Sequence, residues 1–204
     1  MFAGKPMIAH SILAAQKSEI FDHVYVSTED KEIIEISMKY GAEIIYRPEN
    51  LSEDYTPTIP VIRHAIKWMS DNDLNTKAVC CIYATAPFIK KEDLIRGYET
   101  FKEDKWNFVF SATKFSYPIQ RAFMKLETGG VKMFKPKHFQ SRSQDLVEAY
   151  HDAGQFYWGK PAAWLKIEQL FDPDSTICEL PIWRVQDIDN PEDWERAELL
   201  YQLI

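Results

Sequence analysis

The first half of the chain alternates between segments with a helical period and short runs typical of strands. Apolar residues recur at helical spacing over about residues 6–17 and again through "VIRHAIKWM", residues 61–69. A further helix is expected between Ser27 and Gly41, and the runs "HVYVS", "AEIIY" and "AVCCIY" read as strands. This alternation predicts an α/β fold with a doubly wound, mixed or mostly parallel sheet, whose ligands bind beyond the carboxyl ends of the strands.

The run "AVCCIY", residues 78–83, is continuously apolar rather than alternating, which predicts a strand covered on both faces. It contains Cys80 and Cys81, and Cys178 is the third cysteine of the chain. Three cysteines cannot all pair, and the adjacent two lie in an apolar run. We expect reduced cysteines in the core, as is usual in the cytoplasm.

Length and charge narrow the class of protein. A chain of 204 residues is expected to form a single domain, residues 1–204. The net charge of −7 argues against broad binding to nucleic acid, which depends on clustered Lys and Arg, but leaves room for a small anionic ligand. The N-terminal segment lacks the pattern of a signal peptide, and no run is long and apolar enough to predict a membrane span.

The second half departs from the alternation. After a strand at "NFVFSAT", two strand-like runs flank the "TGG" turn at residues 128–130, which predicts a β-hairpin inserted at residues 114–142. Basic side chains gather in and after the hairpin: Lys132, Lys135, Lys137, His138 and Arg142. They would attract an anionic substrate, but a solvated loop would look the same, and charge alone favours the solvated loop.

Near the C-terminus, "VQDIDNPEDWERAE" places Asp187 and Asp189 two residues apart. At the end of a last strand, their carboxylates would point to the same side and suit Mg²⁺. A calcium loop is excluded, because Pro191 and Glu192 occupy positions where a ligand and a glycine are needed. The plain alternative, favoured for the isolated pair, is that Asp187 ends the strand and Asp189 supports the cap of a helix running from Pro191 almost to Ile204.

Two further segments carry polar groups that suit a ligand. In "YATAPFI", Thr85 and Ala86 allow close approach of a nucleotide, although a strand-to-helix turn packed with small residues fits equally well. Tyr83 requires a polar partner if it is buried.

In "YHDAGQFYW", Gly154 permits an unusual turn or a close backbone approach, and His151, Gln155 and Tyr157 offer groups that would hold a sugar. A lone histidine is more often structural than ligand-binding. No arrangement typical of nucleophilic catalysis is visible in the sequence.

These segments together resemble a known family. "GKPMIAHSI", "VYVSTED", "GAEIIYRPENLSED", "YATAPF", "SRSQDL", "YHDAGQFYW" and "DIDNPEDWERAE" stand in the order found in the acylneuraminate cytidylyltransferases, and the resemblance covers the whole chain. Within that family, "CIYATAPF" and "YHDAGQFYW" are similar to the branch that acts on pseudaminic acid.

The resemblance implies an α/β fold of nucleotide-diphospho-sugar transferase type and a nucleotidyltransferase reaction. CTP and pseudaminic acid, a nine-carbon 2-keto sugar acid, would give the CMP-sugar and pyrophosphate with the help of Mg²⁺. It also implies a cytoplasmic homodimer that packs through the hairpin, and a place in nonulosonic acid biosynthesis and flagellin glycosylation.

The resemblance also assigns roles to residues. Asp187 and Asp189 match the metal-binding catalytic pair, Tyr83 and Thr85 the nucleotide and sugar loop, and Tyr157 the tyrosine of the sugar pocket. His151 and Gln155 are expected beside them as further substrate contacts. Gln144 matches the family's Arg-Gln pair, but Ser143 stands at the arginine position, so Arg142, one residue earlier, is inferred to clamp the carboxylate.

The sequence departs from the family pattern at its N-terminus. The family begins with a strand and a Gly-rich, cationic loop that wraps the CTP phosphates, upstream of the "GKP" segment, whereas this sequence starts at Met1. We expect that the reading frame is truncated. The sheet would then lack a central strand, and the CTP phosphates would lack N–H donors. The alternatives are an enzyme for sialic or legionaminic acid, a catalytically impaired fragment that binds sugar and metal, and an unrelated α/β binding module.

Overall fold

The computed structural model describes residues 1–53, 55–166 and 169–203. The helices are α1 (Met7–Ser18), α2 (Lys31–Lys39), α3 (Thr58–Asp71), α4 (Lys91–Phe101), α5 (Pro161–Lys166) and α6 (Pro191–Tyr201). The strands are β1 (Tyr25–Thr28), β2 (Glu43–Tyr46), β3 (Val79–Ile82), β4 (Phe108–Lys114), β5 (Phe123–Lys125), β6 (Val131–Met133), β7 (Tyr150–Gly159) and β8 (Ser175–Glu179).

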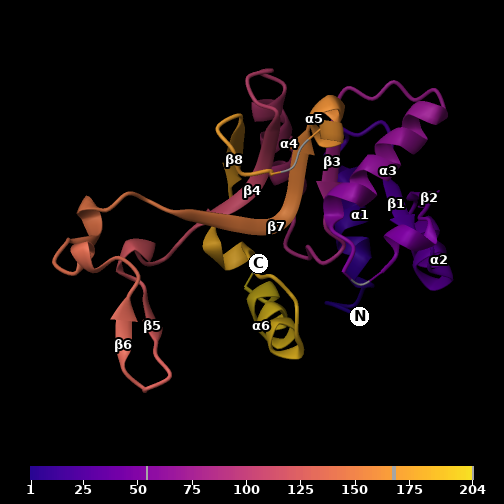
Figure 1. The fold of residues 1–204 in the computed structure, drawn as a ribbon. Helices are drawn as coiled ribbons and strands as arrows, with labels where there is room; N and C mark the ends of the chain where they lie inside the picture. The colour runs from indigo at the N-terminus through magenta and orange to yellow at the C-terminus, as the bar shows by residue number, and fades with distance from the viewer. Residues whose placement is uncertain (54, 167–168, 204) are drawn as a thin grey trace.

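The main sheet is mixed, with the strand order β3-β7-β4-β8 (Figure 1). β4 and β8 are parallel, whereas β7 runs antiparallel to both of its neighbours, β3 and β4. The expected α/β fold with a mixed sheet and an inserted hairpin is therefore confirmed. β7 contains the segment "YHDAGQFYW", which the sequence did not identify as a strand.

β1 and β2 form a separate parallel pair. Within the described part of the chain, no strand joins this pair to the main sheet, so β1 and β3 each have a free edge. The prediction that "AVCCIY" forms a strand is confirmed, and its side chains pack alternately on the two core clusters, but its expected place in a parallel sheet is wrong, because its partner β7 is antiparallel. A long apolar run is thus compatible with an edge strand when helices pack on it.

The core lies on both faces of the main sheet, because side chains alternate along β7. Phe156 and Trp158 pack with Leu94 of α4 on one face. Tyr157 packs with Ile62 of α3 on the other face. Helices α1 and α4 therefore cover one side of the sheet, and α3 and α5 cover the other.

The helices expected at residues 6–17, 28–40, 61–69 and beyond Pro191 are confirmed as α1, α2, α3 and α6. The N-cap of α2 is Asp30, whose side chain accepts from the N–H of Ile33, rather than Ser27, which lies in β1. Asn190 caps α6 as expected. None of the described helices is long and apolar enough to span a bilayer.

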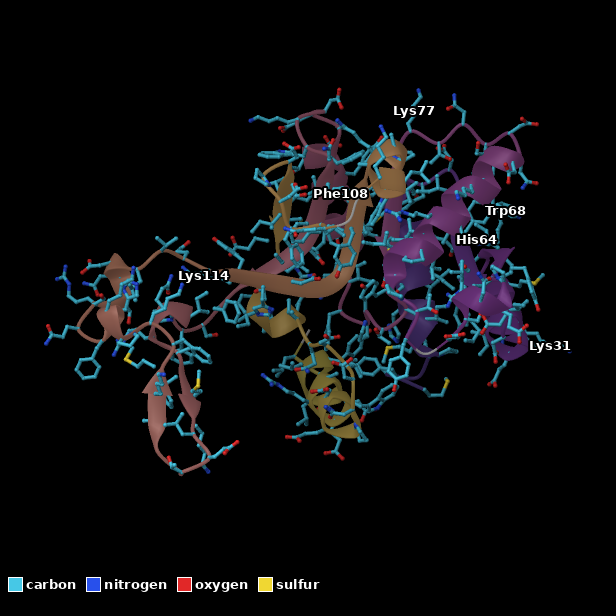
Figure 2. All side chains as sticks on the ribbon, in the orientation of Figure 1. Lys31, His64, Trp68, Lys77, Phe108 and Lys114 are labelled. Atoms are coloured by element: carbon cyan, nitrogen blue, oxygen red, sulfur yellow. The ribbon has the colours of Figure 1, made fainter. Side chains whose placement is uncertain are left out.

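The inserted hairpin forms an arm. β5 and β6 pair antiparallel around the "TGG" turn, where Gly129 has a φ of +87°, within the segment that connects β4 to β7. We call residues 115–149 the arm. Figure 1 shows it extending away from the main sheet, and Figure 2 labels Lys114 where β4 passes into it.

All three cysteines are free, as expected. Cys178 is buried, whereas Cys80 and Cys81 are partly exposed on β3. Burial raises the pKa of the Cys81 thiol to about 12, so this thiol stays protonated at neutral pH.

Candidate active site

A bulge in β7 shapes the centre of the site. Phe110 of β4 pairs with Tyr157 and Ala112 pairs with Asp152, so residues 153–156 of β7 stand opposite Ser111 alone. Ser111 is fully buried, and its hydroxyl accepts from the backbone N–H groups of Gln155 at 3.2 Å and Phe156 at 3.1 Å. Bulges of this kind redirect side chains and are common beside active sites.

Gly154 lies in the bulge and allows Asp187 to approach β7. Its φ is +62°, a left-handed conformation that favours glycine. A Cβ atom at this position would lie 3.9 Å from Oδ1 of Asp187. Of the two alternatives expected for Gly154, the unusual turn is present, whereas the contact with Asp187 is at ordinary van der Waals distance.

The expectation that Asp187 and Asp189 end a strand is wrong. The last strand, β8, ends at Glu179, and both aspartates lie in the irregular segment between a 3-10 turn (Ile182–Arg184) and α6. Asp193, in the first turn of α6, accepts from the N–H of Asp189 at 3.1 Å. The segment is therefore fixed by the start of α6 rather than by sheet pairing.

Negative charge is concentrated around Asp187. Partial desolvation raises the pKa of its carboxyl above the ordinary value, and the neighbouring charge of Asp189 raises it further. Asp152 and Asp193 add to the same effect. Close carboxylates without a balancing cation destabilise their ionised forms, and a divalent cation would relieve this repulsion.

A buried ion pair anchors the segment that leads to Asp187. Arg184 contacts both carboxylate oxygens of Asp93, which lies on α4, and both side chains are almost fully buried. The backbone oxygen of Arg184 accepts from Nε2 of Gln155 at 2.5 Å. Gln155 thus links the bulge to this anchor, and its Oε1 is buried without a hydrogen-bond partner in the described structure.

Sequence reasoning missed Asp93, Arg184 and Ser111. No local pattern marks them, because their partners are distant in sequence: Asp93 and Arg184 are 91 residues apart. The substrate contact expected for Gln155 stays a prediction, and its amide nitrogen already donates to the backbone oxygen of Arg184.

Hydroxyl groups lie in a row that leads from the bulge to the start of α3. The hydroxyl of Tyr157 donates to Oδ2 of Asp152 at 2.6 Å, and Oδ1 of Asp152 accepts from the N–H of Gly154 at 2.9 Å. The rings of Tyr157 and Tyr83 lie 5.3 Å apart. The hydroxyl of Tyr83 lies 3.3 Å from Oγ1 of Thr58, which meets the expectation of a polar partner for Tyr83.

Burial and the charge of Asp152 together raise the pKa of Tyr157 far above its ordinary value. The Tyr157 side chain therefore acts as a neutral hydroxyl at physiological pH. Tyr83 and Tyr157, both predicted to contact substrate, are thus brought together at the edge of the same acidic site.

The other predicted contacts lie farther from this group. Thr85 is exposed in the turn that follows β3. The ring of His151 packs on Phe115 at 4.8 Å, at the base of the arm. Arg142 and Gln144 are on the arm itself, where Arg142 pairs with Asp145 at 2.7 Å. The substrate roles of these residues stay predictions.

A metal at this site would be held by few protein ligands. Among the described residues, no three His, Cys, Asp or Glu side chains are arranged to hold a metal ion. Mg²⁺ does not require such a cage, because one or two carboxylates, waters and substrate phosphates commonly complete its coordination. Asp187 and Asp189 fit that limited role.

The α/β fold is similar to that of two solved synthetases. Over 100% of this chain and 91% of the other, it matches a CMP:2-keto-3-deoxy-manno-octonic acid synthetase complexed with CTP, with a TM-score of 0.68 and 14% sequence identity. A 4-diphosphocytidyl-2C-methyl-D-erythritol synthase from Anaerococcus prevotii matches over 99% and 88%, also with a TM-score of 0.68, at 16% identity. At these identities the likeness establishes the fold alone.

The family follows from the sequence comparisons. The family model described as cytidylyltransferase matches residues 1–160, and the chain belongs to this family of nucleotidyltransferases. A pseudaminic acid cytidylyltransferase from Campylobacter jejuni is 47% identical over 99% of this chain and 88% of its own length. A CMP-N,N'-diacetyllegionaminic acid synthase from Legionella pneumophila is 27% identical over 100% and 88%.

Proposed function

We propose that this cytidylyltransferase transfers CMP from CTP to pseudaminic acid and releases pyrophosphate. The observation that carries the proposal is the 47% identity to a pseudaminic acid cytidylyltransferase, which extends over 99% of the chain. The relative named for a legionaminic acid is 27% identical, which favours pseudaminic acid over that alternative. A Campylobacter coli relative named for flagellin modification, 26% identical, supports a place for the product in flagellin glycosylation.

The reaction joins an oxygen of the sugar acid to the α-phosphorus of CTP. As that bond forms, the bond from the α-phosphorus to the bridging oxygen breaks, the attacking hydroxyl loses its proton, and pyrophosphate leaves. Positioning of the two substrates and neutralisation of phosphate charge supply most of the rate in such reactions.

The described residues suit that task. The bulge in β7 places Gly154 beside Asp187, and Tyr83 lies against Tyr157, whose hydroxyl donates to Asp152. Asp187 and Asp189 would hold Mg²⁺, which on binding screens the phosphates and polarises their oxygens. Tyr83 and Tyr157 would hold the sugar acid next to this point.

Pyrophosphate release tests the proposal directly. The chain is incubated with CTP, Mg²⁺ and, in separate reactions, pseudaminic, legionaminic and sialic acids. We expect release with pseudaminic acid, with kcat/KM at least about tenfold above that for the other two, since a site built for particular polar groups rejects analogues that lack them. Preference for another sugar acid would disprove the substrate assignment.

Replacement of one aspartate tests the metal role. Asp189→Asn should lower kcat by about a hundredfold or more while sugar binding by calorimetry changes little, because loss of an electrostatic contact in the transition state costs about this much. Asp71→Asn, at the exposed end of α3, is the matched control and should behave as wild type. An unchanged kcat in Asp189→Asn would remove the metal role.

A second candidate function is binding of the sugar acid and a metal ion without transfer of CMP. The charges that raise the pKa of Asp187, those of Asp189, Asp152 and Asp193, are all negative, which suits a metal ion better than phosphates. Sugar binding by calorimetry together with no pyrophosphate release would support this candidate over the enzyme.

We also propose a homodimer that forms through the arm. Large apolar side chains on the arm are more than half exposed, a composition typical of a buried interface: Tyr117, Phe123, Val131, Phe134, Phe139 and Val147. An arm packed on a second copy would also account for Arg142 and Gln144, which lie away from Asp187 within one chain. The contact would place them near the partner's site.

Sedimentation and light scattering test the dimer. Phe123→Ser combined with Phe134→Ser should convert the dimer to monomer, because both side chains are exposed on the arm. Leu199→Ser, an equally exposed apolar position on α6, should leave the dimer intact. A wild-type chain that stays monomeric at high concentration would contradict the proposal.

A further inference from the structure

An aromatic cluster packs against the segment that leads into α6. Its centre is formed by Phe2, Phe88 and Ala197, which are almost fully buried. The ring of Phe2 lies 5.5 Å from that of Trp194 and 5.2 Å from that of Tyr201, both on α6. The cluster therefore joins three parts of the chain that are distant in sequence: the N-terminal residues, the turn that follows β3, and α6.

Ile188 connects the pair of aspartates to this aromatic cluster. It is partly buried and packs against the cluster, whereas Asp187 and Asp189, on either side of it, are exposed. These three residues belong to no helix or strand, so regular backbone hydrogen bonds do not set the direction of their side chains. Because the apolar side chain in the middle faces the cluster, the two carboxylates face solvent.

Hydrogen bonds to Asp193 hold the chain on either side of Ile188. Nε2 of Gln186 donates to Oδ1 of Asp193 at 3.2 Å, and the N–H of Asp189 donates to Oδ2 at 3.1 Å. These bonds fix two points of the segment but leave it free to rotate about the line that joins them. The packing of Ile188 supplies the third point, which determines where the carboxylates face.

We propose that Ile188 is a positioning residue: its packing on the aromatic cluster sets the direction of the Asp187 and Asp189 carboxylates, and thereby the affinity of this pair for a divalent cation. The inference rests on the proposed function, in which the pair holds Mg²⁺, and it adds an apolar residue that cannot itself bind the ion. Residues that orient metal ligands commonly change metal affinity by about tenfold or more.

Binding of Mn²⁺ alone tests the inference without either substrate. Mn²⁺ takes the same oxygen ligands as Mg²⁺, and electron paramagnetic resonance measures the fraction that stays free. We expect Ile188→Ala to weaken Mn²⁺ binding about tenfold, toward the affinity of Asp189→Asn. Ile188→Val keeps most of the apolar contact and should stay within about twofold of wild type.

Leu200→Ala is the matched control for stability. Leu200 is also partly buried against the aromatic cluster, but it lies in the last turn of α6, at the other end of the helix from the aspartates. Both alanine substitutions remove apolar contacts and should lower the urea midpoint of unfolding by a similar amount. Leu200→Ala should nevertheless bind Mn²⁺ as wild type does. Equal weakening of Mn²⁺ binding in the two variants would overturn the proposal.

The Mg²⁺ dependence of turnover gives a readout that a general loss of stability would not move. In Ile188→Ala, the Mg²⁺ concentration for half-maximal pyrophosphate release should rise about tenfold, and excess Mg²⁺ should restore most of kcat. The KM for the sugar acid should stay close to that of wild type. A rate that falls by the same factor at every Mg²⁺ concentration would contradict the positioning role.

The two proposals fail in different ways. If no sugar acid reacts but Mn²⁺ binding follows the expected order of variants, the proposed function is wrong and the role of Ile188 stands. If wild type transfers CMP normally while Ile188→Ala binds Mn²⁺ as tightly as wild type, the role of Ile188 is wrong. A wild-type chain that binds Mn²⁺ no better than Asp189→Asn would also overturn that role.

Discussion

Asp93 lies in the first turn of α4 and is 2% exposed, which leaves its charge dependent on protein partners. Arg184 contacts both of its oxygens, and Arg96 contacts Oδ1 at 3.1 Å. Burying two charges costs desolvation energy even when they pair. The main effect of such a pair is therefore to fix one conformation of the chain. Here that conformation is the path of the chain toward Asp187.

Arg184→Met should lower the free energy of unfolding by about 3–5 kcal/mol, because it leaves the Asp93 carboxylate buried with an incomplete set of partners. Urea unfolding at constant m-value measures the loss. Lys102→Met, which breaks an exposed pair with Glu99 on the same helix, should cost less than about 1 kcal/mol. Equal effects of the two substitutions would show that the buried pair has no special role.

His10 gives a pH dependence whose sign follows from its environment. Burial lowers the pKa of its imidazole below 6.5, although the hydrogen bond of Nε2 to the backbone oxygen of Phe2 opposes the shift. The unfolded chain therefore binds a proton more readily than the folded chain. The stability contributed by neutral His10 is present above pH 6.5 and is lost as the pH falls toward the lowered value.

The free energy of unfolding should accordingly be smaller at about pH 6 than at about pH 8, and His10→Gln should reduce this difference. Glutamine retains a donor for the Phe2 carbonyl but does not titrate. His138→Gln, on the arm, should keep the full difference. A pH dependence that is identical in His10→Gln and wild type would assign the effect to other groups.

At the scale of elements, the bulge in β7 depends on a side chain of β4. Ser111→Ala would leave the N–H groups of Gln155 and Phe156 buried without their acceptor, at a cost of about 1–3 kcal/mol. Turnover should fall as well, since the same residues place Gly154 beside Asp187. Ser116→Ala, at the exposed base of the arm, should change neither quantity. Unchanged unfolding in Ser111→Ala would show that the bulge holds without the hydroxyl.

Helices and strands were predicted more accurately where the signal comes from neighbouring residues than where it depends on residues distant in sequence. Periodicity identified α1 and α3, flanking residues identified α2, and the turn residues identified the hairpin. β7 was missed because Gly154 and the polar residues around it interrupt the alternation, and the reason for that interruption is Ser111 on another strand. The aspartates were expected on a strand, whereas pairing ends at Glu179 and α6 fixes them instead.

At the scale of the whole molecule, the sheet is divided. Among the described strands, β1 and β2 pair only with each other and β1 has a free edge, so fewer hydrogen bonds must break to open this pair than to open β4, which lies between β7 and β8. Amides of β1 and β2 should therefore exchange with solvent faster than those of β4. Hydrogen exchange followed by mass spectrometry measures the difference, and equal protection would show that the chain opens as one unit.

The arm and the acidic site were both expected from the sequence, but the physical link between them was not, because it depends on the length of β7. This strand begins at Tyr150, where the arm ends, and reaches Asp152 two residues later, before the bulge. A displacement of the arm would therefore act through β7 on Asp152, which accepts the hydrogen bond from the Tyr157 hydroxyl. The proposed dimer would therefore couple assembly to turnover, and the specific activity should rise with protein concentration as the arms become engaged.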